Sequence, residues 1–269
     1  MDILRRHHVS SYGTGSQPLV FSHGFGTDQQ AWQYVAPAFA ARHRVVLFDL
    51  VGAGSSDKSA YDFARYGTLA GYADDLVNLL RSLQLPKVVY VGHSVSGMIG
   101  VLAAIEAPEL FERLVLLAAS PCYLNDGEYP GGFEAADLEE LLDFLNRDYR
   151  AWSDTMVPNL VGGDMRPELV DEVLASFSRV EPAIARQFSR AAFLSDYRAQ
   201  LTQLRVPSLI IQCAEDSIAP AAVGRYLHER LAGSTLEILN TTGHYPHLNA
   251  PVATISCLER YLGTPLASA

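Results

Sequence analysis

The pentapeptide Gly92-His93-Ser94-Val95-Ser96 follows a largely apolar run at residues 87–91 and opens a segment of small residues at 97–104. A serine on a sharp strand-to-helix turn is a nucleophile elbow, which exposes the hydroxyl at the end of a strand. The turn strains the serine backbone and requires small residues two positions before and two after. Gly92 and Ser96 meet this requirement, although the usual motif ends in glycine where this chain has Ser96. We therefore predict that Ser94 is a nucleophile at a strand end.

Short apolar runs alternate with longer helix-like segments along most of the chain. This alternation is typical of a parallel sheet covered by helices on both faces, so we predict an α/β fold. The predicted strands are residues 19–21, 45–48, 88–91, 114–117, 208–212 and 236–239. Ligands of such sheets bind outside the carboxyl ends of the strands. The polar residues that follow these runs are therefore expected to converge on one crevice.

The alternation stops between about residues 121 and 204, where we find amphipathic segments and no convincing strand. The predicted helices are residues 133–149, 149–160, 166–178 and 182–194. Turn-forming residues at 125–127 and 130–132 lie at the entry to this stretch, and residues 205–207, which end in Pro207, lie at the return to the sheet. We predict a core domain of residues 1–120 and 205–269, with an inserted helical lid at residues 121–204.

Composition excludes several classes of function. The 269 residues carry 20 Lys and Arg against 30 Asp and Glu, and the net charge of −10 repels nucleic acid and anionic membranes. The N-terminus lacks the apolar core of a signal peptide, and no run is long enough to span a bilayer. Three cysteines without metal-ligand spacing suggest neither disulfides nor a zinc site. These features predict a cytoplasmic protein with no nucleic-acid or membrane partner.

A serine hydroxyl needs a histidine base, and a carboxylate must hold that base in the correct tautomer. His244 is the leading base because it follows the last predicted strand and because Gly243 lets the loop turn back toward Ser94. His247 is the main alternative, and it could instead form a hydrogen bond within the loop.

Asp216 is the leading acid because it closely follows the predicted strand at residues 208–212. The adjacent Glu215 is an alternative, but neighbours along a turn point in different directions. Asp49 also lies at a strand end, but it precedes Ser94, whereas the acid is expected to follow the nucleophile along the chain. We expect it to accept hydrogen bonds from backbone amides of the loop at residues 52–57.

Acyl transfer also requires two hydrogen-bond donors for the developing oxyanion. We expect one from the backbone N–H of Val95, directly after the nucleophile. The other is expected from the Phe25 N–H in the loop His23-Gly24-Phe25-Gly26. His23 is expected to brace this loop, and His93 to point away from Ser94 in a structural or pocket-forming role.

Taken together, these motifs resemble the α/β-hydrolase superfamily, and more narrowly the RsbQ-type bacterial hydrolases and the related plant karrikin and strigolactone receptors. The resemblance covers almost the whole chain and is carried by residues 23–29, 48–52, 92–96, 120–126 and 243–247. It implies an α/β-hydrolase fold with a V-shaped pair of helical hairpins over a hydrophobic pocket. It also implies a small hydrophobic ester or lactone as ligand, no metal or organic cofactor, and a monomer.

The resemblance further implies a pocket lining, of which about half is expected to touch ligand because aromatic residues on amphipathic helices usually pack in a core. The implied lining residues are Tyr123, Phe133, Leu141, Met156, Val173, Phe193 and Ser217. Met156 and Val173 occupy positions where the plant receptors tend to carry phenylalanine. The pocket is therefore expected to differ from theirs in width or shape.

The leading functional hypothesis is a serine hydrolase that cleaves small hydrophobic esters or lactones through Ser94, Asp216 and His244 and an acyl-enzyme. The resemblance supplies an alternative, a ligand-sensing hydrolase with slow turnover that acts through a regulatory protein partner. Carbon–carbon bond hydrolases and perhydrolases use the same triad and stay open as further alternatives. A dehalogenase would need Asp at position 94 and is excluded.

Overall fold

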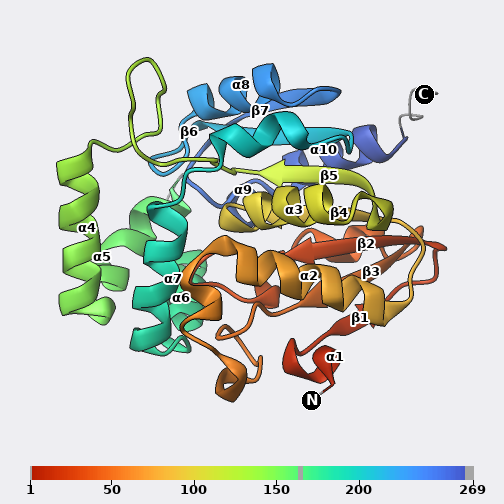
Figure 1. Ribbon diagram of the computed structural model, residues 1–269, viewed down its shortest axis with the longest axis horizontal. Helices are drawn as coiled ribbons and strands as arrows, with labels where there is room; N and C mark the ends of the chain where they lie inside the picture. Colours follow the sequence, from red (N-terminus) through yellow and green to blue (C-terminus); the bar gives the residue numbers. More distant parts are fainter. Residues whose placement is uncertain (1, 163–165, 264–269) are drawn as a thin grey trace.

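The computed structural model describes residues 2–162 and 166–263 (Figure 1). Within these residues lies a seven-stranded sheet with the strand order β1-β3-β2-β4-β5-β6-β7. β1 pairs antiparallel with β3, and every other neighbouring pair is parallel. The strands are β1 Ser10–Tyr12, β2 Gln17–Ser22, β3 His43–Phe48, β4 Val88–His93, β5 Phe111–Leu117, β6 Ser208–Glu215 and β7 Ser234–Thr242. The predicted α/β fold with a mostly parallel sheet is confirmed.

The inner strands are the ones with continuous apolar runs. β4 is buried along its whole length, and β5 beside it is buried except at one position. Strands covered on both faces have an uninterrupted apolar sequence, as β4 and β5 do. All six predicted strands are present, although β7 lies at a sheet edge and is mostly not buried. β1 was not predicted from the sequence. It is short, polar and largely exposed at the sheet edge, so its residues carry no apolar pattern.

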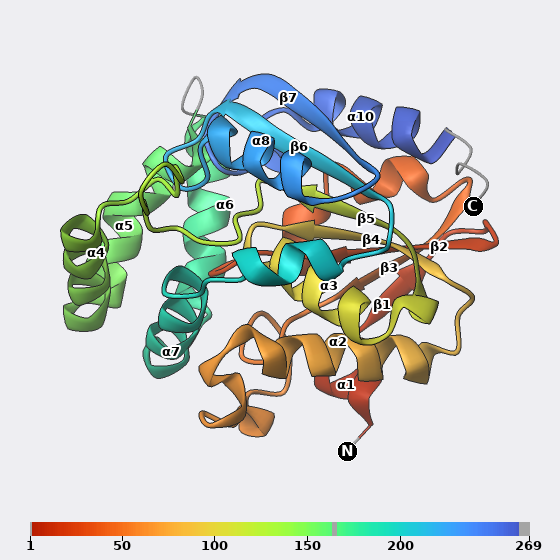
Figure 2. The same cartoon turned by 45° about the horizontal axis from the view of Figure 1, so that its top comes forward.

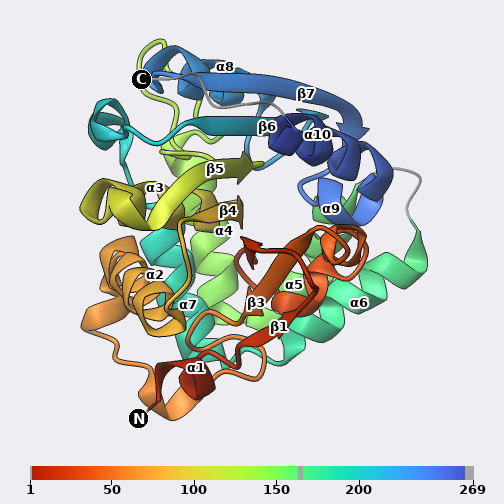
Figure 3. The ribbon, with the colours of Figure 1, turned by 90° about the vertical axis from the view of Figure 1, so that its right-hand side faces the viewer.

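Helices cover both faces of the sheet (Figure 3). One hydrophobic cluster joins one face to residues of α2, α3 and α8, such as Leu76, Val101 and Val223. A second cluster joins the other face to the 3-10 helix η1 and to α10 through Trp32 and Leu258. The described α-helices outside residues 121–204 are α1 Ile3–Arg6, α2 Leu69–Leu83, α3 Val95–Glu106, α8 Ala221–Arg230, α9 Pro246–Asn249 and α10 Pro251–Gly263. The 3-10 helices there are η1 Gln29–Trp32, η2 Ala36–Phe39, η3 Lys58–Ala60, η4 Arg65–Gly67 and η5 Pro108–Leu110.

Four α-helices and the 3-10 helix η6 Arg198–Gln203 occupy the described part of the chain between β5 and β6, and we call residues 121–204 the helical insertion. The α-helices are α4 Ala135–Arg147, α5 Tyr149–Val161, α6 Pro167–Ser178 and α7 Pro182–Phe193. Their bounds agree with the predicted helices to within two residues because local signals mark their starts. Asp148 caps α5 by accepting a hydrogen bond from the Ala151 N–H, and prolines open α6 and α7.

The helical insertion lies to one side of the sheet (Figures 1 and 2). Within it, α4 packs against α5 and α7, and α5 also packs against α6. A third hydrophobic cluster joins these helices to Ile218, in the loop after β6, and to Tyr245, in the loop after β7. The insertion therefore covers the carboxyl ends of the strands, where the sequence predicts the site. Among the helices of the described residues, none combines the length and the hydropathy that a membrane-spanning helix requires.

Candidate active site

Ser94 lies on the turn between β4 and α3. Its backbone has a φ of 54°, which side-chain-bearing residues rarely adopt, and its N–H donates to the Leu117 carbonyl at 2.8 Å. A Cβ on Gly92 would lie 2.4 Å from the Ser96 carbonyl oxygen, so a larger residue does not fit there. The strain and the crowding together give the geometry of a nucleophile elbow.

Ser96, which replaces the usual glycine, connects the elbow to β2. Its hydroxyl accepts a hydrogen bond from the Ser22 hydroxyl at 3.0 Å and donates one to the His23 carbonyl. The serine side chain therefore ties the first turn of α3 to the start of the loop that carries Phe25.

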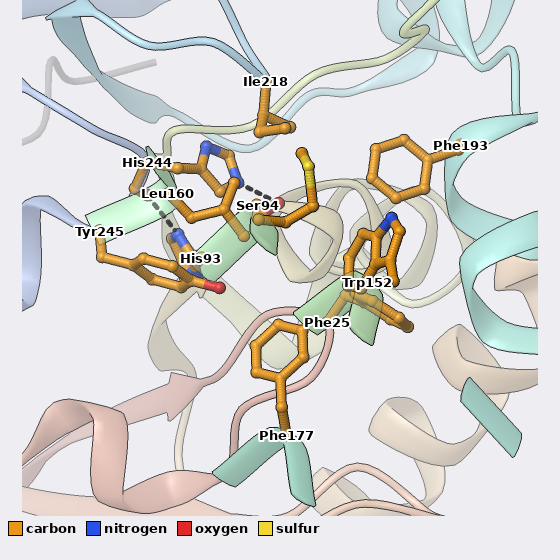
Figure 4. Close-up of a pocket in the computed structure, with 11 residues that line it drawn as sticks. Phe25, His93, Ser94, Trp152, Leu160, Phe177, Phe193, Ile218, His244 and Tyr245 are labelled. Carbon is orange, nitrogen blue, oxygen red and sulfur yellow. Dashed lines mark hydrogen bonds between the residues drawn. The ribbon is translucent and has the colours of Figure 1, made fainter. Parts of the chain in front are cut away.

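Three of the predicted residues are hydrogen-bonded in series. His244 Nε2 lies 2.7 Å from Ser94 Oγ, and His244 Nδ1 lies 2.8 Å from Asp216 Oδ2 (Figure 4 shows Ser94 and His244). Because an ionised carboxylate only accepts hydrogen bonds, Nδ1 carries the proton and Nε2 accepts from the serine hydroxyl. Asp216 Oδ1 accepts from the backbone N–H groups of Ile218 and Ala219, which fixes the orientation of the carboxylate.

The loop that carries His244 is held on two sides. Gly243 has a φ of 101°, and a Cβ there would lie 2.4 Å from the Val161 carbonyl oxygen. The His244 N–H donates to the Leu160 carbonyl of α5 at 2.7 Å, and the His244 carbonyl accepts from His93 Nε2 at 2.8 Å. The backbone of the candidate base is thus anchored to the helical insertion and to β4.

His93 is fully buried beneath the candidate base. Its ring lies 5.0 Å from that of His244 and 4.4 Å from that of His247, measured between centroids. Burial, with the neighbouring histidines as a smaller cause, holds the pKa of His93 well below 6.5, so this ring is neutral near neutral pH. Its contact with the His244 carbonyl matches the structural role expected for it.

Neither alternative to His244 and Asp216 contacts Ser94. His247 stacks on Trp32 at 4.5 Å, and neither of its ring nitrogens has a hydrogen-bond partner among the described residues. The loop hydrogen bond considered for His247 is therefore absent there, and burial lowers the pKa of this ring to about 3. Glu215 is exposed and accepts from the Thr242 hydroxyl at 3.2 Å.

The two polar residues expected to brace loops do so. Asp49 accepts from the Gln29 and Ser55 backbone N–H groups at 2.9 and 2.8 Å. His23 accepts from the Leu50 N–H through Nε2, and its Nδ1 lies 2.9 Å from the Gly24 carbonyl. Both side chains therefore use their polar atoms in hydrogen bonds with backbone groups.

The candidate oxyanion donors lie on the two chain segments that adjoin Ser94. Val95 begins α3, and the first N–H groups of a helix have no partner within the helix. Phe25 follows Gly24, where an added Cβ would lie 3.3 Å from the Ser94 Cβ, so this loop packs directly on the elbow. Neither the Phe25 nor the Val95 amide donates a hydrogen bond to another described residue.

Ser94 and His244 open onto a small cavity of about 30 Å³ beneath the helical insertion. Most of the surrounding side chains are apolar, and α5, α6 and α7 supply several of them (Figure 4). The lining residues are Phe25, His93, Ser94, Trp152, Met156, Leu160, Phe177, Phe193, Ile218, His244 and Tyr245.

Two of the seven residues that the resemblance implied line this cavity, Met156 and Phe193. Tyr123 is buried against the Phe193 ring, and burial raises its pKa to about 12. The other four border clefts elsewhere. Leu141 lines a groove with residues of α4 and α5, Val173 lines one between α6 and η1, and Phe133 and Ser217 line one beside Asp216.

Sequence reasoning missed five side chains of the lining, Trp152, Leu160, Phe177, Ile218 and Tyr245. The spacing of residues along a helix could have predicted some of these five residues. Trp152 precedes Met156 by four residues on α5, and Phe177 follows Val173 by four on α6, so each pair shares a helix face. Tyr245 directly follows the candidate base.

The described residues contain no group of three or more His, Cys, Asp or Glu side chains arranged to hold a metal ion. Asp216, His244 and Ser94 are joined by hydrogen bonds, and His93 Nε2 bonds the His244 carbonyl. The arrangement suits proton transfer from a hydroxyl to an imidazole and the stabilisation of an adjacent negative charge.

A fold with a nucleophile elbow and this order of serine, acid and histidine defines a class of proteins. The sequence model of the "Alpha/beta hydrolase family" matches residues 19–256, and the chain belongs to this family. The predicted membership of the α/β-hydrolase superfamily is thereby confirmed.

Relatives in this family include plant proteins. The chain is 42% identical over 262 residues to the Karrikin insensitive 2 receptor CA of Petunia hybrida, with 97% of each chain covered. It is 44% identical over 262 residues to the Strigolactone esterase D14 of Arabidopsis thaliana, with 97% of this chain and 98% of the relative covered. The structure of olei00960, a hydrolase from Oleispira antarctica, matches with a TM-score of 0.95 and 34% identity over 98% of this chain and 97% of that one.

Proposed function

We propose that the protein is a serine hydrolase that cleaves small hydrophobic esters or lactones. The observation that carries this proposal is the hydrogen-bonded series of Asp216, His244 and Ser94 at the edge of an apolar cavity. Catalytic roles for Phe25 and Val95, through their backbone N–H groups, are part of the same proposal.

In the first half of the reaction, His244 Nε2 removes the Ser94 proton as the oxygen attacks the ester carbonyl. The carbonyl oxygen becomes negative and accepts hydrogen bonds from the Phe25 and Val95 amides. His244 then gives its proton to the departing alcohol oxygen, which leaves an acyl group on Ser94. With a lactone, the alcohol stays attached to this acyl group because the ring has opened.

In the second half, water takes the place of the alcohol. His244 removes a proton from the water as its oxygen attacks the acyl carbon, and the same two amides stabilise the second oxyanion. The proton returns to Ser94 and the acid departs. Asp216 stays ionised throughout and stabilises the charged imidazole.

The apolar lining favours an apolar substrate. Leu160, Phe177 and Ile218 offer no hydrogen-bonding groups, so a charged or extensively hydroxylated substrate would lose hydration without compensation. The cavity has room for only a few atoms, and we propose that residues 121–204 act as a lid that moves to admit the substrate. The unbranched side chain of Met156 borders both the cavity and two outer clefts, and it is the proposed point of entry.

The test is hydrolysis of p-nitrophenyl butyrate by the wild-type protein and by Ser94→Ala, with folding of both verified by circular dichroism. Turnover that disappears in Ser94→Ala, together with an acyl adduct on the Ser94 peptide by mass spectrometry, supports the proposal. Glu215→Gln serves as a matched control, since it changes an exposed carboxylate beside Asp216. Full turnover by Ser94→Ala would overturn the proposal.

Ligand sensing through a protein partner is a second candidate function, favoured by the 42% identity to a protein named a receptor. In this case ligand binding changes the helical insertion, and turnover is slow. The rate separates the two candidates, because enzymes typically turn over about 1 to 10³ times per second. Steady turnover slower than about once per minute, with a measurable acyl adduct on Ser94, would favour sensing.

A further inference from the structure

Tyr245 places a phenol in the cavity that the catalytic proposal does not use. Its side chain is only 2% exposed, and its ring packs 5.1 Å from His93 and 5.7 Å from His244 between centroids. Figure 4 shows its hydroxyl directed toward the middle of the lining side chains, and Tyr245 borders the cavity. The ring is thus fixed while its polar end faces the ligand space.

The Tyr245 hydroxyl forms no hydrogen bond to another described residue, in contrast to two other buried phenols of the protein. The Tyr149 hydroxyl donates to the Phe177 carbonyl at 3.2 Å, and the Tyr129 hydroxyl donates to the Cys122 carbonyl at 2.7 Å. Buried polar groups are nearly always paired, and an unpaired one is unfavourable. Because the Tyr245 hydroxyl faces the cavity and pairs with no described residue, a phenylalanine would fill the same space without the loss of a hydrogen bond within the protein.

The chemistry of the hydroxyl defines the partner that it can take. Burial raises the pKa of Tyr245, so the phenol is neutral and able to donate a hydrogen bond at neutral pH. Leu160 and Phe177, which line the cavity together with Tyr245, have no acceptor in their side chains, and no hydrogen bond joins the hydroxyl to the described polar residues of the lining. The missing partner is therefore an acceptor atom brought by the ligand.

We propose that the Tyr245 hydroxyl is a ligand-recognition group that donates a hydrogen bond to a second oxygen acceptor of the ligand. The proposal rests on the catalytic role of Ser94, because the Phe25 and Val95 amides take the reacting carbonyl oxygen. The preferred substrates are then small apolar esters or lactones that carry one further ether or carbonyl oxygen. Purely hydrocarbon esters leave the phenol unpaired and are disfavoured.

The experiment compares esters that differ only by exchange of one methylene for oxygen. The probes are p-nitrophenyl pentanoate, p-nitrophenyl ethoxyacetate and p-nitrophenyl 3-methoxypropanoate. The measured quantity is the ratio of kcat/KM for each ether ester to that for the pentanoate. Intrinsic differences in ester reactivity cancel when this ratio is compared between the wild type and a variant.

Tyr245→Phe is expected to lower the ratio about fivefold for at least one ether ester, as loss of one neutral hydrogen bond predicts. Tyr129→Phe is the matched control, because it removes a buried hydroxyl that bonds the Cys122 carbonyl and does not line the cavity, and its ratios are expected to equal those of the wild type. Melting temperatures give a second readout. Tyr129→Phe loses a hydrogen bond and is expected to melt lower, whereas Tyr245→Phe loses none and is expected to melt at or above the wild-type temperature.

Unchanged ratios for both ether esters in Tyr245→Phe would overturn the proposal, as would unfolding of this variant, which would make the hydroxyl structural. These outcomes are separate from failure of the catalytic proposal. That failure appears as turnover of the same esters by Ser94→Ala, whatever the ratios in Tyr245→Phe.

Discussion

The two sides of the cavity are built in different ways. The polar side, which we define as His93, Ser94 and His244, is joined by hydrogen bonds of 2.7 and 2.8 Å and anchored to Asp216. The helical side, which we define as Trp152, Met156, Leu160, Phe177 and Phe193, encloses the cavity through ring and aliphatic contacts, such as that between Trp152 and Phe177 at 6.1 Å.

This difference in construction assigns the proposed reaction to the polar side and ligand recognition to the helical side. Hydrogen bonds fix direction as well as distance, so the polar side permits little change of residue or rotamer. Apolar packing tolerates exchange among side chains of similar volume, so the helical side can change shape while the fold persists. Relatives of this chain can therefore share one chemistry and differ in ligand.

The two sides meet at the loops that carry the proposed base and oxyanion donor. The His244 N–H bonds to Leu160 of α5. Asp28, three residues after Phe25, accepts from Arg179 just after α6 while its other oxygen accepts from the Gln30 N–H and caps η1. A movement of α5 or α6 would thus reach the loops beside Ser94 directly.

The largest effect is expected from Asp216→Asn, on the polar side. The amide would keep an oxygen for the backbone N–H groups, but its NH₂ would face His244 Nδ1 and favour the wrong imidazole tautomer. We expect kcat for p-nitrophenyl butyrate to fall by about 10⁴-fold, as in other triads. Glu215→Gln should leave kcat within about twofold of wild type, and an equal loss in both variants would contradict the assignment of Asp216.

A smaller loss is expected where the two sides touch at Gly26. Its φ is 75°, and a Cβ would lie 2.2 Å from the Phe177 ring, so Gly26→Ala must shift the loop that carries the Phe25 amide. Loss of one oxyanion donor reduces turnover by about 10²–10³-fold, and we expect kcat to fall by about 10²-fold. Gly127→Ala is the control, because Gly127 also has a positive φ, 59°, but an added Cβ meets nothing within 4 Å. Comparable kcat values in the two variants would contradict the prediction.

His247, which packs against His93 of the polar side, should also make folding sensitive to acid. Burial lowers the pKa of His247 from 6.5 to about 3, so below pH 6.5 the unfolded chain binds a proton that the folded protein does not. Stability is then present above pH 6.5 and is lost as the pH falls toward 3, by at most about 1.4 kcal/mol per pH unit for this group. His247→Phe keeps a ring against Trp32, and we expect it to lose about 2 kcal/mol less than wild type between pH 7 and pH 5 in urea unfolding. Equal losses would show that His247 is protonated in the folded state.

The smallest effect is expected from Arg179→Met, which removes a link between the helical insertion and the Phe25 loop. Arg179 is 44% exposed while Asp28 is buried, so the variant leaves a buried carboxylate with fewer partners. We expect a loss of about 1 kcal/mol, seen as a fall of about 2–4 °C in Tm. Arg150→Met, which breaks an ion pair on α5 in which Arg150 is 92% exposed, should leave Tm unchanged. An equal change of Tm in the two variants would contradict the prediction that the Arg179–Asp28 ion pair stabilises the fold.

The sequence by itself determined the sheet and the order of its chemical groups. Short, largely apolar runs marked six strands, and the structure places Ser94, Asp216 and His244 in contact because parallel strands end at one edge of the sheet. An apolar run is a local property of the chain, and the meeting of strand ends follows from the topology of the sheet alone. Their catalytic role is what the proposed kinetics will test.

Tertiary structure alone decided which side chains form the cavity. Val173 and Phe177 lie four residues apart on α6, yet Phe177 reaches the cavity while Val173 borders the groove beside η1. Spacing specifies that two residues share a helix face, but the rotation and tilt of that helix depend on its packing against distant segments. The same reason explains why Tyr245 was missed, since only the folded loop after β7 turns its hydroxyl toward the ligand space.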